Sequence, residues 1–277
     1  HRDLHLSIRR QRQMCIRDSL VAISFSCLYA QEWEESFIAG NFDVNGAFMG
    51  GSEVLHIVPH KNKLFASVGY WQDENNIWYG GSDLNIGWSQ IICLDSEIDS
   101  WKVDLDMGYN YLRPEILKQV IFTKDHNGTS LDVPDTLLIA GAYSPNYITG
   151  IVSADIFIRD DEFGSLNQIL VYEGSISSDE SYSMRDIEIY TDQVTGIENL
   201  IISVGTQGIF SGKYNPNIDG KIEIGSVPEV GPLGVRSLGI SIANNFLYFR
   251  RLCHFLRVFF LSLSRQVRKI HQWNHQI

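Results

Sequence analysis

Apolar and polar residues alternate in short runs along most of the chain, and these runs occur in pairs. Each pair begins with a charged residue and an alternating strand, passes through a polar turn, and ends in an apolar run with small residues, such as LFASVG, LLIAGA or LIISVG. Period-two alternation bounded by Gly, Asn and Asp is typical of β-hairpins. Four segments share this plan: Glu53–Trp71, Lys118–Tyr143, Arg185–Gly205 and Arg236–Phe249.

Two further strands follow each of the first three hairpins. Their sequences are SQIICLD and WKVDL in the first unit, SADIFIR and NQILVYE in the second, and GIFSGKY and KIEIG in the third. The joining segments DSEIDS, DDEFGS and NPNIDG contain the residues that tight turns favour. The pattern therefore predicts an all-β chain. Four antiparallel strands repeated at roughly 50–65 residues are the plan of a β-propeller blade.

The motifs GGSEVLHIV, GIFSG and GVRSLGI resemble those of secreted bacterial β-propeller proteins within the broad propeller superfamily. The resemblance covers about residues 47–249 and implies blades of four antiparallel strands at about 47–110, 111–178 and 179–231, with the start of a fourth at 232–249. Propellers close with roughly four to eight blades. We therefore expect residues 31–249 to form a partial β-propeller, incomplete as a ring.

The N-terminal region differs from the repeats in composition. The run SLVAISFSCLYA, Ser19–Ala30, follows Arg12 and Arg17 and ends in a small residue, as in the apolar region and cleavage site of a secretory signal peptide. This predicts a secreted or periplasmic protein, and a buried N-terminal strand is the alternative. Residues 1–18 resemble translated sequencing-adapter sequence, and we assign them no function.

The C-terminal region, residues 250–277, is basic and apolar and lacks the turn-forming and acidic residues of the repeats. The spacing of Leu252, Leu256 and Leu263 fits an amphipathic helix for a membrane surface or a partner. The alternative, a basic tail that is not native to the fold, is favoured because the change at Arg250 is abrupt. A membrane contact is expected only if this tail is genuine.

Charge divides the 277-residue chain into three parts. Both ends are basic, whereas residues 31–249 hold 31 acidic and 11 basic residues, a formal charge of −20. So acidic a segment repels phosphate backbones, and we therefore expect no nucleic-acid partner. The apolar fraction, 44%, excludes a disordered protein and permits a packed core.

Four charged residues begin the four repeats, namely Glu53, Lys118, Arg185 and Arg236. In a propeller the first strand of each blade lines the central channel, so we predict that these side chains ring one mouth of it. Arginine binds carboxylates bidentately, which suits an anionic ligand such as a carboxylated sugar. The alternative is a ring of salt bridges between blades that neutralises itself.

An aromatic loop between the second and third strands of the first unit is a second candidate ligand site. Trp71, Trp78 and Tyr79 lie there among acidic and amide side chains. Exposed aromatic rings flanked by polar groups suit stacking on sugars. The same rings could instead pack over the edges of the blade.

Metal and cofactor sites are not predicted. His56 and His60 would lie about 13 Å apart along a strand, too far to share a metal ion. We expect each histidine to have hydrogen-bond partners or to face solvent, and Cys93 to be a small core residue. The chain has no phosphate loop, dinucleotide fingerprint, GxSxG or HExxH motif, so we predict no cofactor and no metal.

Three functions remain open from the sequence. The leading one is a non-catalytic extracellular recognition module that binds a glycan, an anionic ligand or a protein through the channel mouth and the aromatic loop. The second is a glycoside-active enzyme of the sialidase, glycosidase or lyase kind, which needs arginines converging with a carboxyl or tyrosine. The third is an interaction scaffold without a small ligand.

Overall fold

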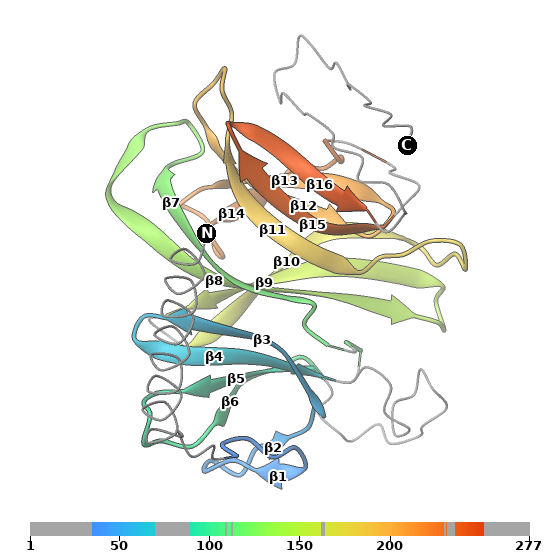
Figure 1. Ribbon diagram of the computed structural model, residues 1–277. Helices are drawn as coiled ribbons and strands as arrows, with labels where there is room; N and C mark the ends of the chain where they lie inside the picture. Colours follow the sequence, from blue (N-terminus) through green and yellow to red (C-terminus); the bar gives the residue numbers. More distant parts are fainter. Residues whose placement is uncertain are drawn as a thin grey trace, which may run out of the picture. The chain divides into compact units, whose positions relative to one another are not determined.

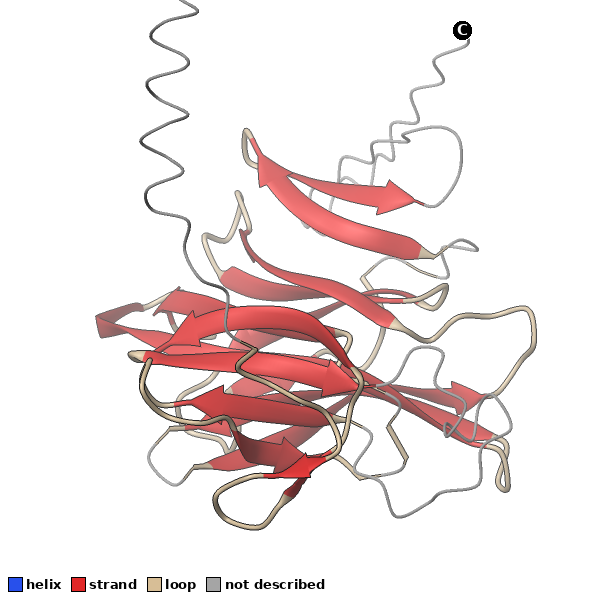
Figure 2. Ribbon diagram, turned by 60° about the horizontal axis from the view of Figure 1, so that its bottom comes forward, coloured by secondary structure: helices blue, strands red, loops and turns tan. Residues whose placement is uncertain are grey.

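A computed structural model describes residues 35–69, 89–108, 110–111, 113–161, 164–229, 231 and 236–251. The chain divides into two units, His1–Phe37 and Ile38–Ile277, and every described strand belongs to the second. Strands and connecting segments account for all described residues, with no helix among them (Figure 2). The all-β prediction is confirmed.

Three sheets of four strands follow one another along the chain (Figure 1). In each sheet the strands pair antiparallel in their order along the sequence. The first sheet contains β3 (Glu53–His60), β4 (Lys63–Gly69), β5 (Gln90–Leu94) and β6 (Lys102–Asp106). The second contains β7 (Ile116–Lys124), β8 (Ser130–Asn146), β9 (Ile151–Asp160) and β10 (Ser165–Ser175). The third contains β11 (Met184–Thr191), β12 (Glu198–Val204), β13 (Gly208–Tyr214) and β14 (Ile222–Ile224).

Two hairpins complete the described strands. The first pairs β1 (Asn41–Phe42) with β2 (Phe48–Met49), and the second pairs β15 (Ser237–Ala243) with β16 (Phe246–Arg251). The buried Gln90 ties the first hairpin to the first sheet, because its amide donates to the Phe48 carbonyl and accepts from the Gly50 N–H. The strands predicted from the sequence patterns are thus all present.

Turn chemistry explains two of the hairpins. Lys61 and Asn62 join β3 to β4, and Asn244 and Asn245 join β15 to β16. All four residues have positive φ, between 45° and 63°. Two successive positive φ values define the type I′ turn, whose twist matches that of the flanking strands and which asparagine tolerates better than most residues. The polar pairs in the sequence therefore specify tight two-residue turns.

The second strand of each sheet contains a continuous buried run. All seven residues of β12 are buried, as are the last five of β4. A strand covered on both faces is a continuous apolar run rather than an alternating one. This accounts for the LIISV and LFASV runs, which break the alternation of the strands that precede them.

Three apolar clusters fill the spaces between neighbouring sheets. The first sheet and the second share the cluster that contains Phe65 and Leu138. The second and third sheets share the largest cluster, around Phe122 and Ile202. Ile201 of the third sheet packs with Leu247 and Phe249 of β16 in another. Cys93 lies in the cluster of the first two sheets, and burial raises the pKa of its thiol to about 11.

A substitution at Gly205, in the turn after β12, tests this packing. Its φ is +43°, and a Cβ there would collide with the carbonyl oxygen of Ser181. We expect Gly205→Ala to lower the free energy of unfolding by about 3 kcal/mol in urea titrations, because backbone must move to relieve the clash.

Gly150 is the matched control. It has a φ of +72°, and a Cβ added there would have no atom within 4 Å. Gly150→Ala should cost only the positive-φ strain, about 1 kcal/mol. Equal costs for the two variants would contradict the packing described at Gly205.

Candidate functional site

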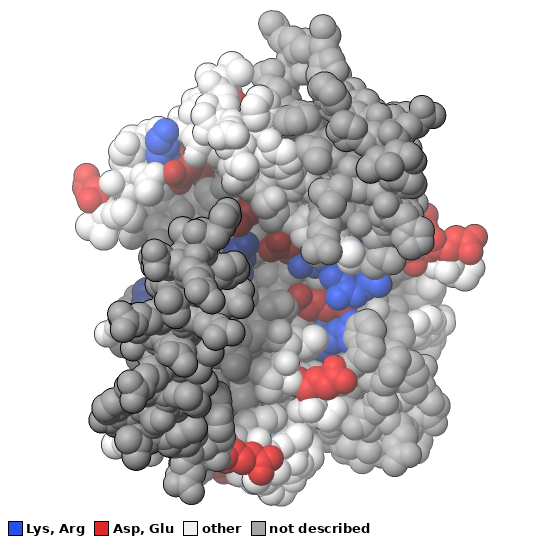
Figure 3. All heavy atoms as spheres, in the orientation of Figure 1, with Lys and Arg blue, Asp and Glu red and all other residues white. Residues whose placement is uncertain are grey.

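Charged side chains gather where the first strands of neighbouring sheets meet. The first strands contact one another in sequence, β3 with β7, β7 with β11, and β11 with β15. We call the charged residues at and just before the starts of β7 and β11 the strand-start cluster; they are Arg113, Glu115, Lys118, Arg185, Asp186 and Glu188. Figure 3 shows basic and acidic side chains interleaved across the middle of one face.

Lys118 links β7 to β11. Its ammonium donates to the Ile187 carbonyl at 2.8 Å and lies 3.3 Å from Asp186 Oδ1 and 3.1 Å from Glu188 Oε1. Asp186 in turn accepts from the Ile240 N–H of β15 at 2.9 Å. Lys118 therefore faces two carboxylates, and its group of contacts spans three successive first strands.

Glu115 is the most buried charge of the cluster. Its side chain is 1% exposed, with Oε1 3.1 Å from Arg113 Nη2 and 3.6 Å from Arg185 Nη2. Burial raises the pKa of Glu115 above its usual range, although the positive charges of Arg185 and Arg113 oppose the shift. Tyr143 lies nearby, and its pKa is raised by burial and by the charge of Glu115.

The four repeat-starting residues were predicted to share one structural position at the beginning of each first strand; all four lie within two residues of those beginnings, but at different registers. Glu53 lies opposite Gly69 at the beginning of β3, and Arg236 directly precedes β15. Arg185 lies in a β-bulge of β11, whereas Lys118 lies within β7, opposite Ile139. Lys118 is the third residue of its strand, because β7 begins at Ile116, directly after Glu115. Strand register decides whether two residues occupy equivalent positions in neighbouring sheets, and a pattern of charges does not reveal register.

The structure pairs two of the predicted residues with carboxylates. Lys118 and Arg185 have the acidic partners described above, whereas Glu53 and Arg236 make no salt bridge with any residue that the structure describes. Arg236 Nε is buried without a hydrogen-bond partner among those residues. Trp71, Trp78 and Tyr79 lie outside the described residues.

Sequence reasoning missed Arg113, Glu115, Asp186 and Glu188. The signal for the first pair was the motif Arg113-Pro114-Glu115, which places two opposite charges just before an apolar strand. The signal for the second was the alternation in RDIEI, which puts two carboxylates on one face of a strand.

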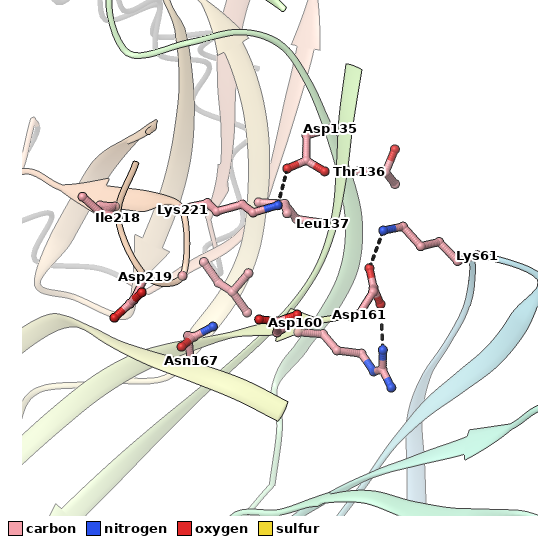
Figure 4. A pocket seen from close by; sticks show the side chains of 13 residues that line it. Lys61, Asp135, Thr136, Leu137, Asp160, Asp161, Asn167, Ile218, Asp219 and Lys221 are labelled. Carbon is pink, nitrogen blue, oxygen red and sulfur yellow. Dashed lines mark hydrogen bonds and ion pairs between the residues drawn. The ribbon is translucent and has the colours of Figure 1, made fainter. Parts of the chain in front are cut away.

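A polar hollow between the second and third sheets is the other candidate site (Figure 4). This side hollow has a volume of about 390 Å³, and residues from four separate segments of the chain line it. They are Lys61 of the β3–β4 turn, Asp135–Leu137 of β8, Ile158–Asp161 with Asn167 around the β9–β10 turn, and Ile218–Lys221 before β14. No pattern in the sequence pointed to it, because its residues come from segments that lie far apart along the chain.

Two groups of ion pairs hold the walls of the side hollow. Lys221 lies 2.7 Å from Asp135, which also accepts from the Tyr214 hydroxyl at 2.8 Å. On the other side, Asp161 lies 2.7 Å from both Lys61 and Arg159 Nη1 (Figure 4). The lysines are thus fixed by carboxylates rather than held free for a ligand.

Arg159 connects this wall to the first sheet. Its guanidinium donates two hydrogen bonds of 2.9 Å to Asp104 of β6 and lies 5.0 Å from the centre of the Phe65 ring. His60, which is buried, lies between Gln119 and Asp161, at 3.0 and 2.9 Å. The other histidine, His56, bonds the Glu115 carbonyl oxygen at 3.0 Å. Both histidines therefore have hydrogen-bond partners, as predicted.

Three polar side chains that line the side hollow have hydrogen-bonding groups available for a ligand. Thr136, Asn167 and Asp219 form no side-chain hydrogen bond with the residues that the structure describes. Thr136 and Asn167 are half-buried and Asp219 is exposed. A hydroxyl, an amide and a carboxylate are thus left to meet a ligand.

Two other kinds of site are absent from the described ranges. No three His, Cys, Asp or Glu side chains come together there as a set of metal ligands. The same ranges contain no helix long and apolar enough to cross a bilayer.

Comparisons with known proteins identify no family. No protein-family profile matches the chain, and no curated protein sequence matches it. Among solved structures, it is similar to a candidate exo-beta-1,3-galactanase from Bifidobacterium bifidum s17, at 12% identity and a TM-score of 0.32. The likeness covers 78% of this chain and 66% of that one, just under two thirds. At that TM-score it carries no conclusion about fold or function.

The ion pairs around Asp161 predict a dependence of stability on pH. Burial alone would raise the pKa of Asp161, but hydrogen bonds from Lys61, His60 and Arg159 outweigh it and lower the pKa to about 2. A carboxyl whose pKa is depressed by folding stabilises the fold above its unfolded pKa of about 4, and that stability is lost as the pH falls towards 2.

We therefore expect Asp161→Asn to lower the free energy of unfolding by roughly 2 kcal/mol at pH 7. The difference from the wild type should shrink between about pH 4 and pH 2, as followed by urea titrations at each pH. A difference that stays constant over this interval would contradict the assigned ion pairs.

Proposed function

We propose that this chain is a secreted β-propeller recognition module that binds an uncharged carbohydrate in the side hollow. The observation that carries the proposal is the lining of that hollow, in which every basic group is matched by carboxylates while Thr136, Asn167 and Asp219 keep their hydrogen-bonding groups available. Secretion is supported by the signal-like run Ser19–Ala30.

The propeller part of the proposal is supported by the order of the strands. Each four-stranded sheet is a meander, and the first strands β3, β7, β11 and β15 contact one another in sequence. Blades arranged around an axis place their first strands in this way. The hairpin β15–β16 repeats the two-residue turn of β3–β4, which fits the beginning of a further blade.

Charge favours a neutral ligand over an anionic one. The side hollow is lined by three basic residues, Lys61, Arg159 and Lys221, and by four acidic ones, Asp135, Asp160, Asp161 and Asp219. The surrounding segment 31–249 adds a formal charge of −20, which repels anions at long range. A carboxylated sugar, expected from the sequence, is therefore less suitable than an uncharged one.

The chemistry of the lining favours a polyhydroxylated ligand. Each sugar hydroxyl both donates and accepts, so it can satisfy an amide, a carboxylate and a hydroxyl within one small site. The volume, about 390 Å³, lies in the usual range for small-molecule sites. The ion pairs fix the walls around these groups, so the walls need little reorganisation when a ligand binds, which reduces the cost of association.

The experiment is a binding survey with neutral gluco-, galacto-, manno- and xylo-oligosaccharides, followed by calorimetry on the tightest one. Asn167→Ala and Asp219→Ala should each weaken binding by about fivefold, because each removes a hydrogen bond worth about 1 kcal/mol. Asn167→Ala keeps the Cβ that packs beside Gly220, so the fold should be unaffected.

Asp179→Ala is the control for a lost exposed carboxylate. Asp179 lies in the loop before β11 and does not line the side hollow. Its loss should leave the affinity unchanged. Failure of every neutral sugar to bind, or equal weakening by all three variants, would contradict the proposed site.

A second candidate function is glycoside hydrolysis at the strand-start cluster. It is favoured by the approach of two arginines to one carboxyl, since Arg113 and Arg185 both face Glu115 beside Tyr143. Against it, Glu115 is 1% exposed and already engaged by both guanidinium groups. A substrate would have to displace those contacts to reach the carboxyl.

Glu115→Gln separates the two functions. We expect it to lower the free energy of unfolding by about 3 kcal/mol, because two buried or half-buried guanidinium groups lose their counter-charge. Oligosaccharide affinity, measured below the unfolding transition, should not change. Hydrolysis of aryl glycosides by the wild type, abolished in a folded Glu115→Gln variant, would favour the enzyme instead.

A further inference from the structure

A second hollow lies between the same two sheets as the side hollow. It has a volume of about 370 Å³ and is lined by Leu170–Glu173 of β10, by Gln207 and Phe210, and by Ile224–Ser226 and Pro228 after β14. The side hollow uses Asn167 of β10 and Ile218–Lys221 before β14. Both hollows therefore lie along β10 and use residues in β14 or next to it, and β10 and β14 are in contact.

At Gly220, which lines the side hollow, the β13–β14 turn packs closely against β10. A Cβ at this position would lie 3.0 Å from Ile169 Cδ1 and 3.1 Å from the Cβ of Asn167. The backbone of the β13–β14 turn thus approaches β10 closely only because residue 220 has no side chain.

A β-bulge brings Asn167, Ile169 and Tyr172 to the same side of β10. The register of β10 with β9 shifts between Leu170 and Tyr172. Without the bulge, odd and even positions would point to opposite faces. With it, Ile169 and Tyr172 both pack against the core shared with the third sheet, and Asn167 faces Gly220 on that side.

The second hollow supplies what the first one lacks, an aromatic wall. Tyr172 is half-buried, stacks on Tyr182 at 6.1 Å between ring centres, and meets the Phe210 ring edge-on at 6.0 Å. A ring held in this way offers an apolar surface of fixed orientation, on which the C–H face of a sugar packs. Glu173 and Gln207 add polar groups at the same place.

We infer that the two hollows are successive subsites for one linear, uncharged oligosaccharide that lies along β10. The inference rests on the proposed function and extends it from a single sugar to a chain. Asn167 of the side hollow and Tyr172 of the second hollow lie about 16 Å apart along the strand. A ligand that contacts both residues must therefore be longer than a single sugar. The side hollow forms hydrogen bonds with hydroxyl groups of one sugar, and the second hollow packs against the ring of a sugar further along the oligosaccharide.

The test compares affinity with chain length, using neutral oligosaccharides of one to six residues from the series that binds. Wild-type affinity should rise by at least tenfold between the disaccharide and the hexasaccharide. Tyr172→Leu, which keeps apolar bulk and removes the aromatic face, should lose this gain while binding the disaccharide within twofold of the wild type.

Leu170→Arg provides an independent block that does not touch the core. Leu170 is 50% exposed and lines the second hollow, so a long side chain there obstructs it at little cost in stability. Ile121→Arg, at an equally exposed position of β7 outside the hollows, is the matched control. Leu170→Arg should weaken only the longer sugars, and Ile121→Arg none.

The outcomes separate the inference from the proposed function. Equal wild-type affinity for disaccharide and hexasaccharide, with both β10 variants binding as the wild type does, overturns the two-subsite inference and leaves the side hollow standing. Failure of the wild type to bind any sugar of the series overturns both.

Discussion

The face-to-face packing of neighbouring sheets is the constraint on which the rest of the structure depends. Strands such as β12 are buried on both sides, so no sheet can cover its own apolar surface. Units of this kind are stabilised by their neighbours rather than individually. The β15–β16 hairpin shows the same dependence, because Leu247 and Phe249 are buried against Ile201 of the preceding sheet.

Polar contacts between sheets set their relative register, and they decide which charges remain for a ligand. Lys118 and Arg185 bridge adjacent first strands, so their charges are neutralised within the fold. The alternative of a self-neutralising set of salt bridges, open from the sequence, fits these two residues. Asp135 and Asp161 have the same effect at the side hollow, where fixed ion pairs frame unpaired polar groups.

The strands and their pairing could be predicted because they follow from local pattern. Alternating runs such as EVLHIV and small-residue runs such as LIISVG specify hairpins, and the pairs Lys61-Asn62 and Asn244-Asn245 specify two of their turns. The sites could not be predicted, because they depend on register and on contacts between distant segments. Arg185 lies in a β-bulge of β11, whereas Glu53 pairs with Gly69 just before a bulge of β3, and the lining of the side hollow includes both Lys61 and Lys221. The basic residues at the repeat starts suggested an anionic ligand, whereas the carboxylates that pair with the basic groups of the side hollow favour a neutral one.

The most direct measurement is a titration of isotope-labelled protein with the best-binding neutral oligosaccharide, followed through backbone amide chemical shifts. The account predicts that the largest shifts come from Asn167, Tyr172 and Gly220, along β10 and the β13–β14 turn. Shifts centred on Lys118 and Arg185 at the strand-start cluster, with none along β10, would contradict it.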